Sequence, residues 1–215
     1  MPQLILRGRI IGTVNGILFD KDGTLINSES RLLQLAQFRL KEALRIYKEK
    51  PGKELALKQL NRLLRVNYGL QNDQIDPNGS IAIASRKDNL ISTATIFSIL
   101  GETWPESIKL SNEIFLSADY LLSNQTSCEE KDELLPGVER LLGYLRKVKL
   151  KVGIISNDSK KGIKSFIEQY TLEKYFQEFW SSDDFPSKPE PNAVRELCNQ
   201  MKVKTSECAL IGDAE

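Results

Sequence analysis

The sequence predicts an α/β protein, with a doubly wound parallel sheet into which an all-helical segment is inserted. An apolar run near the start, Ile17 to Phe19, has the length and composition of a buried strand. Residues 28–132 then show only helical spacing of apolar side chains. From Leu135 onward strand and helix patterns alternate, which favours right-handed crossovers between parallel strands.

The first residues predict strands. Residues 3–12 are expected to form one or two short strands at an edge of the sheet, with Arg7-Gly8 as a turn. They lead into the central strand at residues 14–20. Two carboxylates, Asp20 and Asp22, follow its apolar run.

Residues 28–132 predict an inserted subdomain. Apolar residues recur at helical spacing between breaks such as Pro51-Gly52 and a loop at 73–79. Helices are expected over 30–50, 56–68 and 81–100, with a further helix beginning at Pro105. Four amphipathic helices can bury a core of their own. We therefore expect a helical cap at 28–132 and a core made of 1–27 and 133–215.

The last third predicts the rest of the core. Strands are expected at 151–156, 179–182 and 208–211, and helices at 138–145, 160–170 and 189–202. In open parallel sheets the ligand binds beyond the carboxyl ends of the strands. The polar residues that follow each expected strand are therefore the candidates for a site.

Composition limits the classes of partner and location. The net charge of +1 gives no electrostatic reason to expect a nucleic acid. No run approaches the roughly 18 apolar residues of a membrane span, and residues 1–13 lack the apolar core of a signal peptide. We expect a cytoplasmic protein with no membrane partner.

The chain contains no histidine, which excludes Ser-His-Asp and Cys-His catalysis and His-ligated zinc. Acid–base chemistry must then use carboxylates, lysine, tyrosine or a thiol, and a metal would be a hard cation bound by oxygen. Three cysteines, Cys128, Cys198 and Cys208, lack metal-ligand spacing, and we expect them to be reduced, structural thiols.

Asp20 and Asp22 are the strongest candidates for chemistry. Residues i and i+2 of a strand point the same way, so both carboxylates can face one site. One can act as a nucleophile while the other moves a proton. The same residues, with Gly23, also fit a plain turn that ends a strand.

Three later segments follow expected strands or begin expected helices. Ser156-Asn157 could bind phosphate near a helix start, or Ser156-Asn-Asp-Ser could simply cap that helix. Lys188 lies just before an expected helix, where a cation opposes the helix macrodipole. Its position therefore fits either a lysine with an anionic neighbour or a lysine that is simply exposed. Asp213 could be a metal ligand or part of a turn.

Taken together and in this order, these segments resemble the four motifs of the haloacid dehalogenase superfamily, specifically its phosphatases. The resemblance covers nearly the whole chain, since 28–132 is similar to that family's inserted cap and the rest to its Rossmann-like core. The residues that carry it are Asp20-Lys21-Asp22-Gly23-Thr24, Ser156-Asn157, Lys188-Pro189 and Gly212-Asp213.

The resemblance implies a role for each residue. Asp20 is implied as the nucleophile that forms an aspartyl-phosphate, and Asp22 as the acid that protonates the leaving oxygen and then activates water. Lys188 is implied to neutralise the charge on the nucleophile and the phosphoryl group. Thr24, Ser156 and the backbone around Asn157 are implied to bind the phosphoryl oxygens. Phosphoryl transfer depends mainly on positioning and charge neutralisation, which a histidine-free chain can supply.

The resemblance also implies magnesium as cofactor, bound by the carboxylates of Asp20 and Asp213 and the backbone carbonyl of Asp22. The family's last motif usually continues with another acid, then a further strand and helix, whereas this chain stops at Glu215. We therefore expect a core that is truncated at the C-terminus. On that expectation, these 215 residues bind magnesium weakly and turn over slowly, if at all.

The expected function is magnesium-dependent hydrolysis of a small phosphorylated metabolite, because a helical cap limits substrate size. Among capped relatives the sequence looks most like phosphoglycolate-phosphatase-type enzymes. Two alternatives stay open: a sugar phosphomutase of the beta-phosphoglucomutase kind, and an inactive family fold used for binding. Either a monomer or a homodimer is compatible with the sequence.

Overall fold

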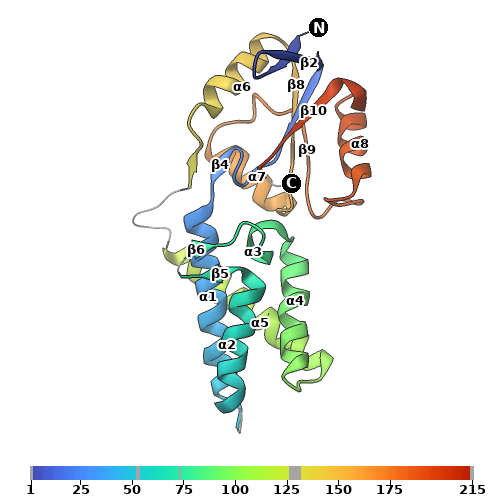
Figure 1. Ribbon diagram of the computed structural model, residues 1–215. Helices are drawn as coiled ribbons and strands as arrows, with labels where there is room; N and C mark the ends of the chain where they lie inside the picture. The colour runs from blue at the N-terminus through green and yellow to red at the C-terminus, as the bar shows by residue number, and fades with distance from the viewer. Residues whose placement is uncertain (1, 52–53, 73, 126–131, 214–215) are drawn as a thin grey trace. The chain divides into compact units, whose positions relative to one another are not determined.

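The computed structural model describes residues 2–51, 54–72, 74–125 and 132–213. The chain divides into two compact units, one made of residues 1–27 and 133–215 and the other of residues 28–132 (Figure 1). The first unit contains a parallel sheet with helices, and the second is built mainly of helices. The predicted α/β class, with helices inserted into it, is confirmed.

The sheet of the first unit has four parallel strands in the order β10-β3-β8-β9. Their bounds are β3 (Gly16–Phe19), β8 (Lys151–Ile155), β9 (Glu178–Trp180) and β10 (Cys208–Ile211). Phe19 lies opposite both Ile211 and Ile154, so three strands end at the same level. The residues that follow these strands therefore meet at one edge of the sheet.

Helices cover both faces of this sheet (Figure 1). One face packs Ile17, Phe19 and Ile154 against α6 (Val138–Lys147) and α7 (Lys160–Gln169). The opposite face packs alternate residues of the same strands against another helix. That cluster consists of Leu18, Ile155 and Trp180 with Ala193, Leu197 and Cys198 of α8 (Pro191–Gln200). The alternation follows the two-residue period of a strand.

Gly153 of β8 allows α8 to approach the sheet closely. A Cβ on this glycine would lie 2.7 Å from Met201 Sδ and 3.1 Å from Leu18 Cδ2. A side chain at this position would therefore force the flexible Met201 side chain to move, and glycine avoids that displacement. The close approach involves the C-terminal end of α8, because Met201 directly follows its last residue.

The first strands differ from expectation. β1 (Gln3–Leu6) and β2 (Arg9–Thr13) pair antiparallel in a separate two-stranded sheet. Their turn has positive φ at Arg7 and Gly8, 49° and 78°, which suits a two-residue hairpin connection. The turn was predicted correctly, but the placement at an edge of the central sheet was wrong.

A second short ribbon closes the first unit where the chain leaves it and returns. β4 (Ile26–Asn27) pairs antiparallel with β7 (Glu133–Leu134). The Leu135 N–H donates to the Leu25 carbonyl at 3.0 Å, which extends this pairing. These two strands were not predicted from the sequence.

The second unit has its own apolar core. Its helices are α1 (Glu29–Lys48), α2 (Glu54–Tyr68), α3 (Ser80–Ile83), α4 (Arg86–Ile99) and α5 (Trp104–Gln125). The core includes Tyr47, Phe97 and Phe115, none of which is exposed. Tyr47 and Phe97 are in ring contact, with centroids 5.4 Å apart.

Two local features of this unit differ from expectation. The single helix expected over 81–100 is interrupted, because Ser85 is extended and its hydroxyl caps α4 by accepting from the Asp88 N–H at 3.1 Å. The loop expected at 73–79 contains part of a small antiparallel ribbon, in which β5 (Leu70–Gln71) pairs with β6 (Gln74–Ile75). Residue 73 lies outside the described residues.

Arg39 of α1 is a buried cation within this helical unit. Only 3% of the residue is exposed, and its Cζ lies 3.7 Å from the centroid of the Phe115 ring. Its Nε has no hydrogen-bond partner among the described residues. Burial lowers the pKa of Arg39 to about 10, although the charges of Tyr68 and Asp119 act in the opposite direction. A cation desolvated in this way opposes folding.

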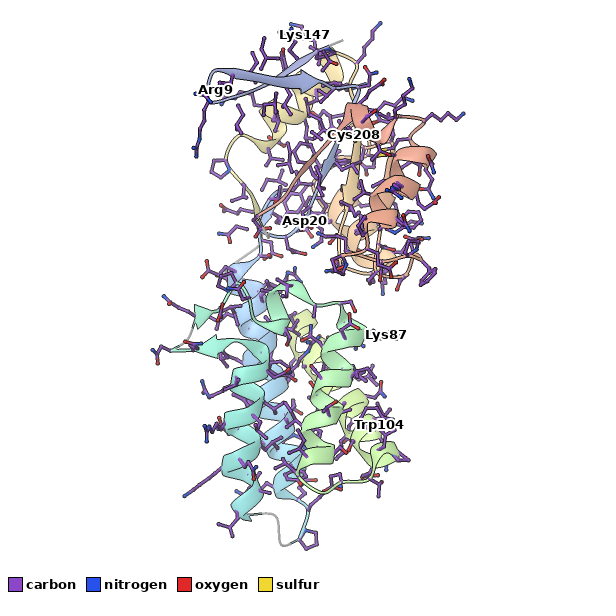
Figure 2. The ribbon with its side chains drawn as sticks, turned by 45° about the vertical axis from the view of Figure 1, so that its right-hand side comes forward. Arg9, Asp20, Lys87, Trp104, Lys147 and Cys208 are labelled. Carbon is purple, nitrogen blue, oxygen red and sulfur yellow. The ribbon has the colours of Figure 1, made fainter. Side chains whose placement is uncertain are left out.

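Two of the cysteines lie in the first unit as free thiols: Cys198 is buried and Cys208 is half-buried. Burial, reinforced by the neighbouring Cys198, raises the pKa of Cys208 to about 12. Figure 2 shows Cys208 at the end of the sheet away from Asp20. Cys128 lies outside the described residues. In the described part of the chain, no helix combines the length and the apolar character that crossing a membrane would require.

Candidate active site

Asp20 stands at the carboxyl end of β3 (Figure 2). Its N–H donates to the Ile211 carbonyl at 2.9 Å, so the β3–β10 pairing continues up to Asp20. Its Oδ1 accepts from the Lys21 N–H at 2.8 Å, and its Oδ2 accepts from Lys188 Nζ at 2.7 Å. The carboxylate is therefore held in one orientation by a backbone donor and a cation.

Lys188 reaches Asp20 from the loop between β9 and α8. The Trp180 indole N–H donates to the Pro186 carbonyl at 2.7 Å and so ties this loop to β9. The Lys188 side chain is 23% exposed and that of Asp20 is 15% exposed, so their ion pair is partly shielded from water. The structure thus brings together two predicted residues that are 168 positions apart in the sequence.

The turn after Asp20 is compact. The Lys21 carbonyl accepts from the N–H groups of Leu25 and Ile26 at 2.9 and 3.2 Å, and the Gly23 N–H donates to the Ile26 carbonyl at 3.0 Å. Gly23 has a φ of 75°, a conformation that glycine adopts without strain. These bonds hold the backbone of Asp22 within the turn.

Asp213 packs directly on this turn. A Cβ on Gly23 would lie only 2.0 Å from Asp213 Oδ2, so the carboxylate occupies the space that a larger residue would fill. The Thr24 hydroxyl donates to Asp213 Oδ1 at 3.5 Å. Gly212 lies next to Asp20, since a Cβ built on it would be 3.5 Å from Asp20 Cβ. Asp20, the Gly23 turn and Asp213 therefore form one cluster.

This cluster fits a hard cation in donor chemistry. Asp20 and Asp213 supply carboxylates from the ends of adjacent strands, and Asp22 can supply a backbone carbonyl, so all the donors are oxygen. Among the described residues no group of three or more His, Cys, Asp or Glu side chains is arranged to hold a metal ion. A magnesium ion here would thus depend on two carboxylates, a carbonyl and the substrate's own oxygens.

Ser156 and Asn157 follow β8. The Ser156 N–H donates to the Trp180 carbonyl at 3.0 Å, and only 3% of the residue is exposed. Its hydroxyl accepts from the Asp158 N–H at 3.1 Å, which leaves the hydroxyl hydrogen able to point elsewhere. Ser159 caps α7 by accepting from the Gly162 N–H at 3.1 Å. Ser156-Asn157 thus lies just before a helix N-terminus, where anions are favoured.

Two residues at this edge were not among the predicted site residues. Lys21, which is 3% exposed, lies 2.7 Å from Asp22 Oδ2 and 3.3 Å from Asp158 Oδ2, measured from its Nζ. Asp158 in turn accepts from the Ser159 N–H at 2.7 Å. The position of Lys21 between two acids in the sequence could have marked it as a site residue. The distance in sequence between Lys21 and Asp158, however, gives no sign that the two are in contact.

A cavity of about 740 Å³ lies elsewhere on the first unit. It is wide open and is lined by Asn199, Lys202, Val203, Lys204, Thr205 and Ser206, which lie between the end of α8 and the start of β10. Since β10 runs toward Asp213, this cavity lies near the amino end of that strand. The candidate site is therefore identified from the cluster of acids and lysines at the carboxyl ends of the strands, and not from this cavity.

Comparison with protein families matches residues 14–215 to the haloacid dehalogenase-like hydrolases. The chain belongs to this family. The matched range includes every residue of the candidate site.

Curated relatives of this family match over part of their length. A phosphoglycolate phosphatase of Vibrio parahaemolyticus is 30% identical over 90 residues, which are 41% of this chain and 40% of the relative. A haloacid dehalogenase-like hydrolase domain-containing protein of Arabidopsis thaliana is 27% identical over 114 residues, 53% of this chain and 43% of the relative. The chain thus spans less than half the length of these curated relatives.

Solved structures share the fold at low identity. A predicted phosphoglycolate phosphatase from Haemophilus somnus is 18% identical with a TM-score of 0.62, covering 94% of this chain and 78% of that one. A 2-haloacid dehalogenase from Pseudomonas syringae is 20% identical with a TM-score of 0.54, covering 94% and 79%. Because the names of these two structures differ in reaction, the shared fold does not decide the chemistry.

Proposed function

We propose that this protein is a magnesium-dependent phosphomonoesterase that acts on a small phosphorylated metabolite through an aspartyl-phosphate. The ion pair between Asp20 Oδ2 and Lys188 Nζ, at 2.7 Å, carries the proposal. A lysine can neutralise the charge of a phosphoryl group as it approaches a carboxylate, and electrostatic stabilisation of this kind dominates phosphoryl transfer. The phosphoglycolate phosphatases among the curated relatives support the substrate class.

In the first step an Asp20 carboxylate oxygen attacks phosphorus and the bond between phosphorus and the leaving oxygen breaks. Protonated Asp22 gives its proton to that oxygen. In the second step the Asp22 carboxylate takes a proton from water, whose oxygen attacks phosphorus. The bond to Asp20 then breaks, which releases inorganic phosphate and restores both acids.

Other residues bind and orient the phosphoryl group. We assign its oxygens to the hydroxyls of Thr24 and Ser156 and to the backbone around Asn157, at the start of α7. Magnesium, when bound by Asp20, the Asp22 carbonyl and Asp213, supplies positive charge that offsets that of the phosphoryl oxygens.

The test is release of inorganic phosphate from 2-phosphoglycolate and p-nitrophenyl phosphate with magnesium present. We expect turnover by the native protein and none by Asp20→Asn, which keeps the side-chain volume but removes the nucleophile. Glu196→Gln, a change on the exposed surface of α8, serves as the matched control and is expected to retain full activity.

Two results would overturn the proposal. Turnover by Asp20→Asn at the native rate would remove the proposed nucleophile. Transfer of the phosphoryl group to a sugar phosphate, detected as glucose 1,6-bisphosphate with no phosphate released, would identify a mutase instead of a hydrolase.

A further inference from the structure

Lys21 is a buried cation that holds two acids at once. Its Nζ lies 2.8 Å from Asp22 Oδ1 and 2.7 Å from Asp22 Oδ2, so it contacts both oxygens of that carboxylate. The same Nζ lies 3.3 Å from Asp158 Oδ2 and 5.9 Å from the centroid of the Phe166 ring. The lysine side chain is 4% exposed, whereas those of Asp22 and Asp158 are 25% and 32% exposed.

These contacts join two loops of the site. Asp22 belongs to the turn after β3, and Asp158 follows Ser156-Asn157 at the end of β8. The Lys21 backbone adds to the connection, because its N–H donates to Asp20 and its carbonyl accepts from Leu25 and Ile26. One residue therefore contacts the proposed nucleophile, the proposed acid and the loop that carries the proposed phosphate-binding serine.

Because Lys21 is buried, its ammonium depends on these contacts and is fixed in place by them. A lysine ammonium out of water is stable only when it is paired. Asp158 remains its charged partner when Asp22 carries the proton of the first step, and Lys21 can then still donate to the unprotonated oxygen of Asp22. Asp158 is itself fixed, since its carboxylate accepts from the Ser159 N–H and lies within 2.3 Å of where a Cβ on Gly162 would be. The ammonium thus has little room to move, and it confines Asp22 in turn.

We propose that Lys21 is a positioning residue, whose ammonium holds the Asp22 carboxylate in place for proton transfer by bridging it to Asp158. This inference rests on the proposed function, in which Asp22 is the acid and then the base. Lys21 has no contact with the reacting phosphorus in this role. It acts on the reaction through Asp22.

The role predicts that the effect of removing Lys21 depends on the leaving group. An alkyl phosphate such as 2-phosphoglycolate needs a proton on its leaving oxygen, whereas p-nitrophenolate leaves without one. Lys21→Met should therefore slow the first step with 2-phosphoglycolate but not with p-nitrophenyl phosphate. With either substrate the second step should be slow, because water still requires a base.

The experiment compares rapid-mix and steady-state kinetics of the native protein, Lys21→Met and Lys21→Arg. We expect Lys21→Met to lose roughly 10- to 100-fold in kcat on 2-phosphoglycolate, the size typical of a misplaced catalytic group, with KM changed less than about threefold. With p-nitrophenyl phosphate it should release one equivalent of nitrophenolate quickly and then turn over slowly. Lys21→Arg, which keeps the cation, should recover most of the activity.

The matched control is Lys160→Met. Lys160 also pairs with an acid, its Nζ lying 3.2 Å from Asp184 Oδ1, but its side chain is 51% exposed. We expect native kinetics from this variant. If Lys21→Met does not fold, Asp158→Asn tests the same bridge, because it weakens the second partner of Lys21 and should cause a smaller loss in the same direction.

Hydrogen exchange of the Leu25 and Ile26 amides gives a readout that needs no turnover. Both donate to the Lys21 carbonyl, which the substitution keeps. Loss of the side-chain bridge to Asp22 and Asp158 should loosen this turn, so the two amides should exchange faster in Lys21→Met than in Lys160→Met. Native kcat on 2-phosphoglycolate in Lys21→Met, or equal loss on both substrates without the rapid release, would overturn the positioning role.

The proposed function can fail separately. A full-length protein that is inactive on every phosphomonoester tested with magnesium would refute the hydrolase and, with it, a catalytic role for Lys21. The exchange measurement then still decides whether Lys21 orders the turn. An active native protein with an inactive Asp20→Asn variant but an unaffected Lys21→Met would refute the positioning role alone.

Discussion

Replacing Gly23 with alanine is expected to damage the proposed magnesium site more than it damages the fold. The new Cβ would lie 2.0 Å from Asp213 Oδ2 and 2.6 Å from its Cγ, whereas ordinary contact begins near 3.4 Å. The Asp213 carboxylate must therefore retreat by roughly 1.4 Å, and a misplacement of that size costs a site up to about 100-fold. The left-handed φ of 75° adds a strain of about 1–2 kcal/mol.

Gly137→Ala separates these two effects. Gly137 has a φ of 91°, and no other group lies within 4 Å of the position that a Cβ would take, so alanine there is strained without meeting a neighbour. We expect both variants to lose a similar free energy of unfolding in urea. Only Gly23→Ala should require more magnesium for half-maximal phosphatase activity, by roughly 10- to 100-fold. An equal magnesium requirement in the two variants would refute the contribution of Asp213 to the metal site.

Two further predictions concern groups away from the site. Burial holds the pKa of Arg39 below its value in the unfolded chain, so the buried cation lowers stability at pH 7. Arg39→Met should therefore raise the free energy of unfolding in urea, by up to about 3 kcal/mol. The exposed control Arg195→Met should change it by less than about 0.5 kcal/mol. A less stable Arg39→Met would contradict this account. Because the pKa of Cys208 is raised to about 12, its thiol stays protonated at pH 8. A Cys128→Ser chain should therefore react slowly with a thiol reagent until it is unfolded in urea. Rapid reaction of the folded chain would contradict this prediction.

The main sheet was predictable because its rules act along the chain. The alternation of Ile17, Leu18 and Phe19 between two faces follows from strand period, and the meeting of Asp20 with Asp213 follows from parallel strands that end together. The Asp20–Lys188 contact followed from motif order rather than from spacing. The roles of these residues in catalysis stay a prediction.

The features that were missed depend on tertiary contacts or on weak local signals. The ribbon of β4 and β7 has two residues in each strand, too few for any periodicity. The bridge from Lys21 to Asp158 joins residues whose separation in sequence carries no information. By contrast, the break before α4 could have been predicted, because Ser85 followed three residues later by Asp88 is a helix-start pattern.

The ribbon of β4 and β7 has a consequence for how this chain can vary. Ile26 pairs with Leu134 and Asn27 with Glu133, so the two ends of the interruption in the α/β unit lie side by side, at the roughly 5 Å spacing of antiparallel partners. A connection of a few residues could close that gap, and so could a hundred-residue insert, because loop-closure entropy grows only slowly with length. The ribbon therefore lets the length of the insert change while the strands that carry the acids keep their positions.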